Sequence, residues 1–425
     1  MATDSLINSL SSLSIIITGV NGNKYDVTEN VTAFTIYESI DSFFLSGIMS
    51  MYDDSGLINR IPLVGQESVL ITFVKDSIKR SINLNIIDIH DVTKIRTDAS
   101  GIKFRLVSTK ELLNSASTFS QSYSGSSTSI ISSIHADHLN ESIRIYDGGA
   151  STMNIVFPYI KPYQAISKVL QSAFDVNGAP LFLFETLNGP GYPVIKSIKS
   201  MMSEEAKFTI GESALFNTGL AGSTVRGMTD DRHHIDSIKQ EAAYNTLSLL
   251  SRGSYASNVT HHDISLKTVN NTVFNYKNNA ESVNPEMISD NFKLNEYSLS
   301  GLSNAKHHVL NHNSKAFDNS LANFTSIEPR SLLIRKSYTN RMFLSTLNIE
   351  VDPIKEIECG NCINVMIQQN IPTLDKVSAD KISSGKYMIS AIAHIFTNTS
   401  EGETYKMAIE LVRDGIGINH QKVKK

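Results

Sequence analysis

Apolar and polar residues alternate along several short segments of this chain, which is the pattern of half-buried β-strands. Near the start, a series of such segments follows the turn at Gly65, at residues 68–73, 82–89 and 102–107. Near the end, a second series follows the turn at Gly360, at residues 363–367, 387–396 and 404–412. Both have a glycine turn, a short strand, a longer strand and a closing strand. The repeat predicts two similar small antiparallel β-barrels.

Helical spacing interrupts the strands in the middle of the chain. Apolar residues at 130–139 recur on one helical face, and Ser127 or Thr128 is placed to cap that helix. A second helix is predicted to start at Pro162, and a third at Ser326–Pro329. The short apolar run Leu247–Leu250 is read as a strand, whereas residues 277–325 predict long loops over a short helix.

These changes of pattern divide the chain into four regions. The fold class we expect is α+β and mainly β, with a lateral α/β region beside two barrels that resemble tube domains. The expected boundaries are 1–110 for the first barrel, 111–244 and 277–344 for the lateral region, 245–276 and 345–414 for the second barrel, and 415–425 for a C-terminal tail.

Composition narrows the class of protein. The chain has 425 residues, 41% of them hydrophobic and 19% charged, which is enough apolar content for several cores. A net charge of -4 gives no basic footprint for nucleic acid. With two cysteines, no signal-like start and no long apolar run, we expect a soluble protein made in a cytoplasm, without a membrane-spanning segment.

Cys359 and Cys362 are the candidate metal or redox pair, because they flank Gly360-Asn361 at the spacing of a Cys-x-x-Cys motif. Zinc sites combine such a pair with further ligands, and redox pairs open a helix. Here the pair straddles a turn that enters a predicted strand, which explains the residues without a cofactor. We therefore expect no catalytic residue, no cofactor and no enzymatic activity, and a Cys-pair metal or redox protein is the alternative from another class.

The stretch 37–47 mixes aromatic and polar residues where a predicted strand ends. One interpretation is a corner between strands, with Phe44 and Leu45 in the barrel core. The other is a contact between subunits, because aromatic residues are enriched in interfaces. The candidate interface residues are Tyr37, Glu38, Ile40, Phe43 and Phe44.

Residues 38–67 resemble the first barrel of the baseplate hub proteins of contractile-tailed phages. The matching segments are Glu38-Ser39-Ile40, Phe44–Gly47, Tyr52–Leu57 and Ile61–Glu67. Two later segments are similar as well: Gln121–Gly125 with Ile130-Ile131, where the family enters its lateral domain, and Ser251–Ala256, where it re-enters the second barrel.

The resemblance implies a homotrimer in which two barrels per subunit form a pseudo-sixfold ring. That ring would join the central spike to the tail tube or its initiator proteins, contact the surrounding baseplate wedge proteins and leave a central channel for DNA. The implied location is the tail baseplate of a virion assembled in the host cytoplasm. A hub of a contractile bacteriocin or extracellular injection system is the nearest alternative, and a glycan-binding tail accessory is another.

Overall fold

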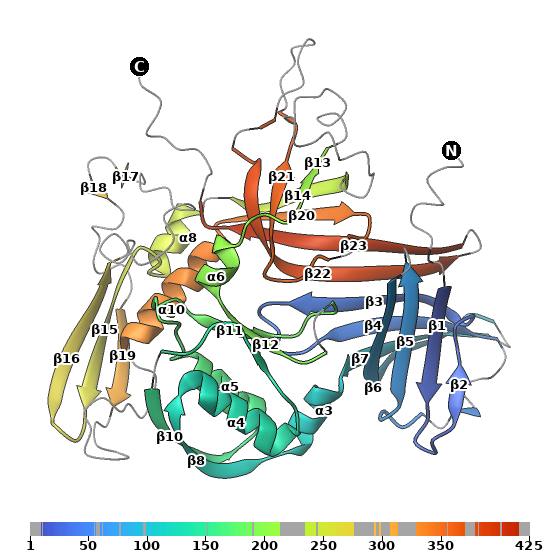
Figure 1. Cartoon of the computed structure of the whole chain (residues 1–425), viewed down its shortest axis with the longest axis horizontal. Coiled ribbons are helices and arrows are strands. Elements are labelled where there is room, and N and C mark those ends of the chain that lie inside the picture. The colour runs from blue at the N-terminus through green and yellow to red at the C-terminus, as the bar shows by residue number, and fades with distance from the viewer. Residues whose placement is uncertain are drawn as a thin grey trace.

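The structure of the chain is a computed structural model (Figure 1). It describes residues 10, 12–54, 56, 60–61, 63–75, 78–96, 99–150, 152–188, 191–212, 234–243, 245–275, 293–294, 297–298, 307–312, 329–354, 356–369, 379–380, 382–399 and 402–415. A long β-sheet crosses the upper and right parts of Figure 1, and smaller sheets and most helices lie below it and to its left.

The long sheet contains 13 strands among the described residues. In sheet order, its main path is β14 (Ile235–Ala243), β20 (Ser345–Val351), β23 (Gly402–Arg413), β22 (Gly385–Thr399), β3 (Val31–Ser39), β4 (Ser46–Asp53), β7 (Ser100–Ser108), β6 (Ile78–Lys94), β5 (Ser68–Lys75), β1 (Ser12–Thr18) and β2 (Lys24–Asp26). The short strands β21 (Cys362–Met366) and β13 (Thr209–Gly211) extend it beside β22. Alternate side chains of these strands are buried on one face, as the sequence pattern predicts.

Two groups of strands within this sheet repeat one topology. The first strand set is β3-β4-β7-β6-β5, and the second strand set is β14-β20-β23-β22-β21, with every neighbouring pair antiparallel. The turns that precede β5 and β21 also match, because Gly65 has φ +86° and Gly360 has φ +83°. The repeated series of three strands after each glycine turn, predicted from the sequence, is confirmed.

The two strand sets share a ladder and a core. Residues 33–39 of β3 pair antiparallel with residues 391–397 of β22, and the rings of Phe34 and Phe396 stack beneath that ladder with centroids 4.2 Å apart. Among the described residues, no ladder closes either set on itself. The mainly-β, α+β fold class is therefore confirmed, whereas two separate barrels stay a prediction.

The lateral α/β region packs below the long sheet in Figure 1. Its elements are α3 (Thr109–Ala116), β8 (Phe119–Ser126), α4 (Ser127–Leu139), β9 (Arg144–Ile145), β10 (Thr152–Ile160), α5 (Pro162–Leu170), β11 (Leu181–Phe184), β12 (Val194–Ser197) and α6 (Ile198–Ser203). The predicted caps of α4, Ser127 or Thr128, are wrong by one or two residues, since the side chain of Ser126 accepts a hydrogen bond from the Ser129 amide at 3.2 Å. Helices α4 and α5 bury their apolar faces in one hydrophobic core.

A third layer stands at the left of Figure 1. It contains β15 (Ala256–Asp263), β16 (Thr268–Asn275), β19 (His307–His312) and α10 (Pro329–Met342), with α8 (Thr246–Ser251) and the strand pair β17 (Lys293–Leu294) and β18 (Tyr297–Ser298) nearby. We expected residues 245–276 to supply strands of the second barrel. Instead, β15 pairs with β16 and β19, and β14 is the strand that pairs with β20. The Leu247–Leu250 strand prediction is wrong, since α8 covers it.

The remaining predictions for this part of the chain have mixed outcomes. The helix expected from Ser326–Pro329 is present as α10, beginning at Pro329 among the described residues. The loops and short helix predicted for 277–325 lie largely outside the described residues. In the described part of the chain, no helix has the length and apolar character needed to cross a membrane.

Candidate functional site: the corner between β3 and β4

The segment singled out by the sequence, residues 37–47, forms the corner between β3 and β4. Glu38 and Ile40 are each only 1% exposed and contact their own chain, whereas Tyr37 is 40% exposed on the opposite face of the sheet. Phe43 and Phe44 are half-buried against the lateral core. Subunit contact through these residues stays a prediction, and within one chain the corner joins three parts of the fold.

The Glu38 carboxylate is the centre of this corner. Its Oε2 accepts a hydrogen bond from the Leu187 amide at 2.6 Å, and its Oε1 accepts one from the Cys359 amide at 3.3 Å. The buried His394 ring on β22 places Nε2 at 3.8 Å from Oε1 and hydrogen-bonds Tyr405 through Nδ1 at 2.8 Å. Burial, reinforced by the Glu38 charge, raises the pKa of the Tyr405 phenol. One carboxylate thus contacts the lateral region, the Gly360 turn and the second strand set.

Glu185 makes the reciprocal connection from the lateral region. Its Oε2 accepts from the Leu45 amide at 3.0 Å, and its Oε1 lies 2.6 Å from the ammonium group of Lys110. Lys110 also donates to the Gly191 carbonyl at 3.2 Å and lies 3.5 Å from the Glu141 carboxylate. Each glutamate therefore accepts a hydrogen bond from a backbone amide of the segment that carries the other: Glu38 from Leu187, and Glu185 from Leu45. Buried charges with this many partners hold segments in one relative position.

Aromatic packing fixes the tip of the corner. The Tyr163 ring on α5 lies 5.2 Å from the Phe43 ring and 4.3 Å from the Phe44 ring, measured between centroids. The Tyr163 hydroxyl hydrogen-bonds Nε2 of His135 at 2.7 Å. Burial, with the charge of Lys110 as a second cause, lowers the pKa of His135 to about 4, so the ring is neutral near pH 7. Aromatic pairs of this kind add to the stability given by buried area.

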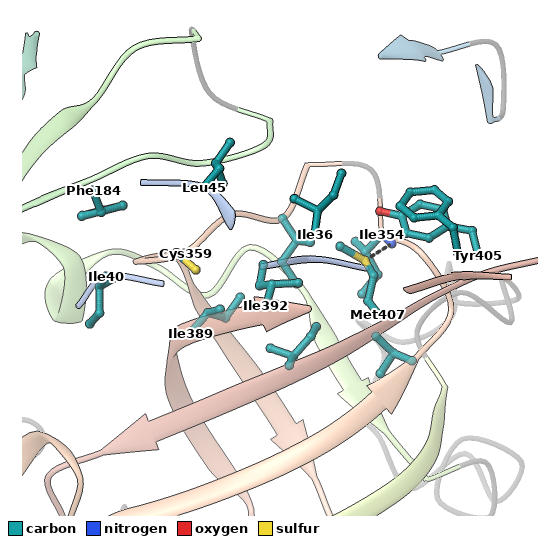
Figure 2. Close-up of a cluster of buried hydrophobic side chains, with 14 of the residues drawn as sticks. Ile36, Ile40, Leu45, Phe184, Ile354, Cys359, Ile389, Ile392, Tyr405 and Met407 are labelled. Atoms are coloured by element: carbon teal, nitrogen blue, oxygen red, sulfur yellow. Dashed lines mark hydrogen bonds between the residues drawn. The ribbon is translucent and has the colours of Figure 1, made fainter. Parts of the chain in front are cut away.

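The cysteine pair lies beside this corner, at the start of β21. Both cysteines are free and buried. The Cys362 thiol donates to the Met201 carbonyl, with sulfur and oxygen 3.2 Å apart. Burial raises the pKa of Cys362 to about 11, and burial together with the Glu38 charge raises that of Cys359. Metals and redox partners react with thiolates, so this environment opposes both roles; Figure 2 shows Cys359 among apolar side chains of the core.

A small polar cavity lies beside Cys359. It has a volume of about 260 Å³, and its lining includes Arg144, Tyr146, Lys196, Glu358 and Cys359. The cations of Arg144 and Lys196 lie 4.7 and 4.8 Å from the centroid of the Tyr146 ring. Lys196 is also paired with Glu204 at 3.1 Å. Within the described part of the chain, no group of three or more His, Cys, Asp or Glu side chains is arranged to hold a metal ion.

Sequence reasoning missed Glu185 and His394, two buried polar residues of this site. Glu185 ends the buried apolar run Leu181–Phe184, and a carboxylate in such a place signals a buried partner. His394 occupies a core position of the alternating strand β22, which is a similar signal. The partners lie far apart in the chain: Leu45 and Glu185, for example, are 140 positions apart. Pairing at that distance depends on the tertiary fold.

Comparisons with known proteins agree with this architecture. No family model matches the sequence, and no curated protein matches it. A tail protein from Neisseria meningitidis MC58 superimposes with a TM-score of 0.53 at 13% identity, over 95% of this chain and 98% of that one. The 43 kDa tail protein of prophage MuSo2 from Shewanella oneidensis gives a TM-score of 0.53 at 10% identity, over 95% and 99%. The resemblance predicted from residues 38–67 is thus confirmed at the level of fold: this chain has the fold of phage tail proteins along nearly its whole length.

Proposed function

We propose that this protein is the structural baseplate hub of a phage contractile tail. Three copies form a ring of six strand sets, join the central spike to the tail tube and surround the central channel. The protein is not an enzyme, and its location is the tail baseplate of the virion, after assembly in the host cytoplasm. Its partners are the spike, the tube or its initiator proteins and the surrounding wedge proteins.

The observation that carries this proposal is the repeat of one strand topology within a chain that shares its fold with tail proteins. Three chains with two similar sets each supply six similar positions, which lets a threefold assembly meet a sixfold tube. The buried corner at Glu38 and Glu185 suits this role, because it holds the sets and the lateral region in one arrangement.

The mass of the purified protein in solution tests the proposal directly. Light scattering across a range of concentrations is expected to approach three times the 46.8 kDa of one chain, and electron micrographs are expected to show rings with three lobes. A monomer at all concentrations, alone and with the spike, would contradict the proposed ring. Particles that carry the protein and package DNA are phages, whereas particles without DNA would make it a bacteriocin-type hub.

A further inference from the structure

The matched strand sets allow each position in one set to be assigned a counterpart in the other. The ladder of β3 shifts register between Val31 and Ala33, and the ladder of β14 shifts between Ile235 and Ser237, in each case opposite the same rung of the following strands. The ladder of β6 shifts after Ile86, and that of β22 shifts after Ile389. Thus β14 corresponds to β3, and β6 corresponds to β22. The ladder of β6 shifts again after Ile89, and that of β14 after Gln240, where the ladders of β22 and β3 have no second shift.

Within the chain, the edge of β3 pairs with residues 391–397 of β22, which are the far half of that strand, beyond its register shift at Ile389. The corresponding two edges have no strand beside them in the described part of the chain. There, β14 pairs with β20 alone, and the far half of β6, beyond Ile86, pairs with β7 alone. Unpaired strand edges are sites where another strand adds.

The exposed side chains at these edges indicate a missing neighbour. Val92 is 63% exposed, whereas its counterpart His394 is fully buried. The two are counterparts because the partner of Val92 on β7 lies four positions from Leu106, and the partner of His394 on β23 lies four positions from the matching Leu411. In the same way Ile89 is 39% exposed, although its counterpart Ile392 is 1% exposed. Apolar side chains exposed where the repeat buries them are typical of an interface.

We propose that β14 of one copy adds antiparallel to the far half of β6 in a second copy, repeating between subunits the β3–β22 ladder within each. Transferring that ladder predicts the register: Val92 opposite Gln240, Thr93 opposite Lys239, and Lys94 opposite Ile238. Val92 and Ile238 then take the positions of His394 and Phe34 on the core side of the extended sheet, and their partners Gln240 and Lys94 take those of Ile36 and Phe396.

The second strand must come from another copy, because six strands of the same sheet separate β14 from β6 in the described chain. A contact between two different edges is head-to-tail, and it makes a ring if the rotation closes and a filament if it does not. The inference rests on the proposed hub, since three copies joined this way place six strand sets in one closed sheet.

Cysteine cross-linking tests this register. In a T93C/K239C double variant, a short bifunctional thiol reagent should link neighbouring copies and give covalent dimers and trimers on a denaturing gel. A mixture of T93C chains with K239C chains should give linked dimers of the two. The parent protein, whose own cysteines are buried, should stay at the mass of a single chain under the same treatment.

The chain offers a matched control at the equivalent internal position. Thr35 lies opposite Ile395 in the β3–β22 ladder, so a T35C/I395C variant should cross-link within one chain and add no mass of a second copy. A protein that is trimeric by light scattering but links only in this control would overturn the β14–β6 contact and leave the proposed trimer standing. Covalent ladders beyond three copies would support the contact and contradict the closed threefold ring. A monomer without links would overturn both.

Discussion

At the scale of single residues, buried polar groups decide how the parts of this chain meet. Glu38 and Glu185 are 1% and 4% exposed, and each accepts a hydrogen bond from a backbone amide of the segment that carries the other. A buried carboxylate is costly unless its oxygens are bonded. Because both glutamates obtain their partners only when the corner and the lateral region are docked, the pair favours one arrangement over looser ones.

Replacing Glu38 by Gln tests this contribution. The amide keeps one acceptor oxygen and puts an NH₂ group opposite one of the two backbone amides that now donate, so we expect the free energy of unfolding to fall by about 2 kcal/mol. Urea denaturation measures the change. Glu29→Gln, at an exposed position, removes the same charge and should shift the midpoint little. Equal losses in the two variants would show that the bonds to Glu38 are not the cause.

His135 predicts a specific dependence of stability on pH. Its pKa is lowered to about 4 in the folded protein, below the ordinary value of about 6.5. The unfolded chain therefore binds the proton more readily, and the stability due to neutral His135 is lost as pH falls from about 6.5 towards 4. We expect the parent to lose about 2 kcal/mol from this group between pH 7 and pH 5. His135→Gln should remove that part of the slope in urea denaturation at the two pH values, and an unchanged slope would contradict the assignment.

At the scale of elements, strict alternation was the reliable signal and composition was the misleading one. Strands such as β7 and β23 bury alternate side chains and were predicted from that pattern. In contrast, β8 is mostly exposed and rich in Ser and Gly, so its sequence resembles a linker. The run in α8 is too short to separate helix from strand, and its helix is fixed locally by Asn245, whose side chain accepts from the Ser248 amide at 3.0 Å.

The turn at Gly360 gives a prediction at this scale. Its φ of +83° disfavours other residues, and a Cβ there would lie 2.7 Å from Sδ of Met201. We expect Gly360→Ala to destabilise the protein by more than about 1 kcal/mol, measured by the thermal midpoint. Gly22→Ala is the matched control, since Gly22 has φ +79° but nothing within 4 Å of a Cβ. A control loss as large as that at Gly360 would mean that packing against Met201 adds nothing.

At the scale of the whole molecule, one arginine connects the outlying layer to the lateral region. Arg335 on α10 donates through Nη1 to the carbonyls of Leu170 and Leu181, both at 3.0 Å, and lies 4.9 Å from the centroid of the Phe182 ring. Burial lowers its pKa to about 10, and the charge of Asp41 in the corner opposes that change. The residue therefore couples α10 and the sheet packed on it to the corner.

Arg335→Met should loosen this connection while leaving the strand sets folded. We expect amide hydrogen exchange in α10 and β15 to quicken about tenfold or more, because two buried carbonyls lose their donor. Exchange in β3 and β22 should change little. Lys168→Met, which removes an exposed charge from α5, is the control. Uniform quickening across every layer would instead indicate a general loss of stability.

The register shift shared by β3 and β14 bears on the ancestry of the chain. Thr32 occupies the bulge in one strand and Asp236 the bulge in the other, so the residue has changed while the local geometry has stayed. A bulge inserts one residue into a ladder, and removing it would turn every later side chain to the wrong face. A duplication of one strand set accounts for the shared bulge, which is then a more durable trace of the repeat than any residue in it.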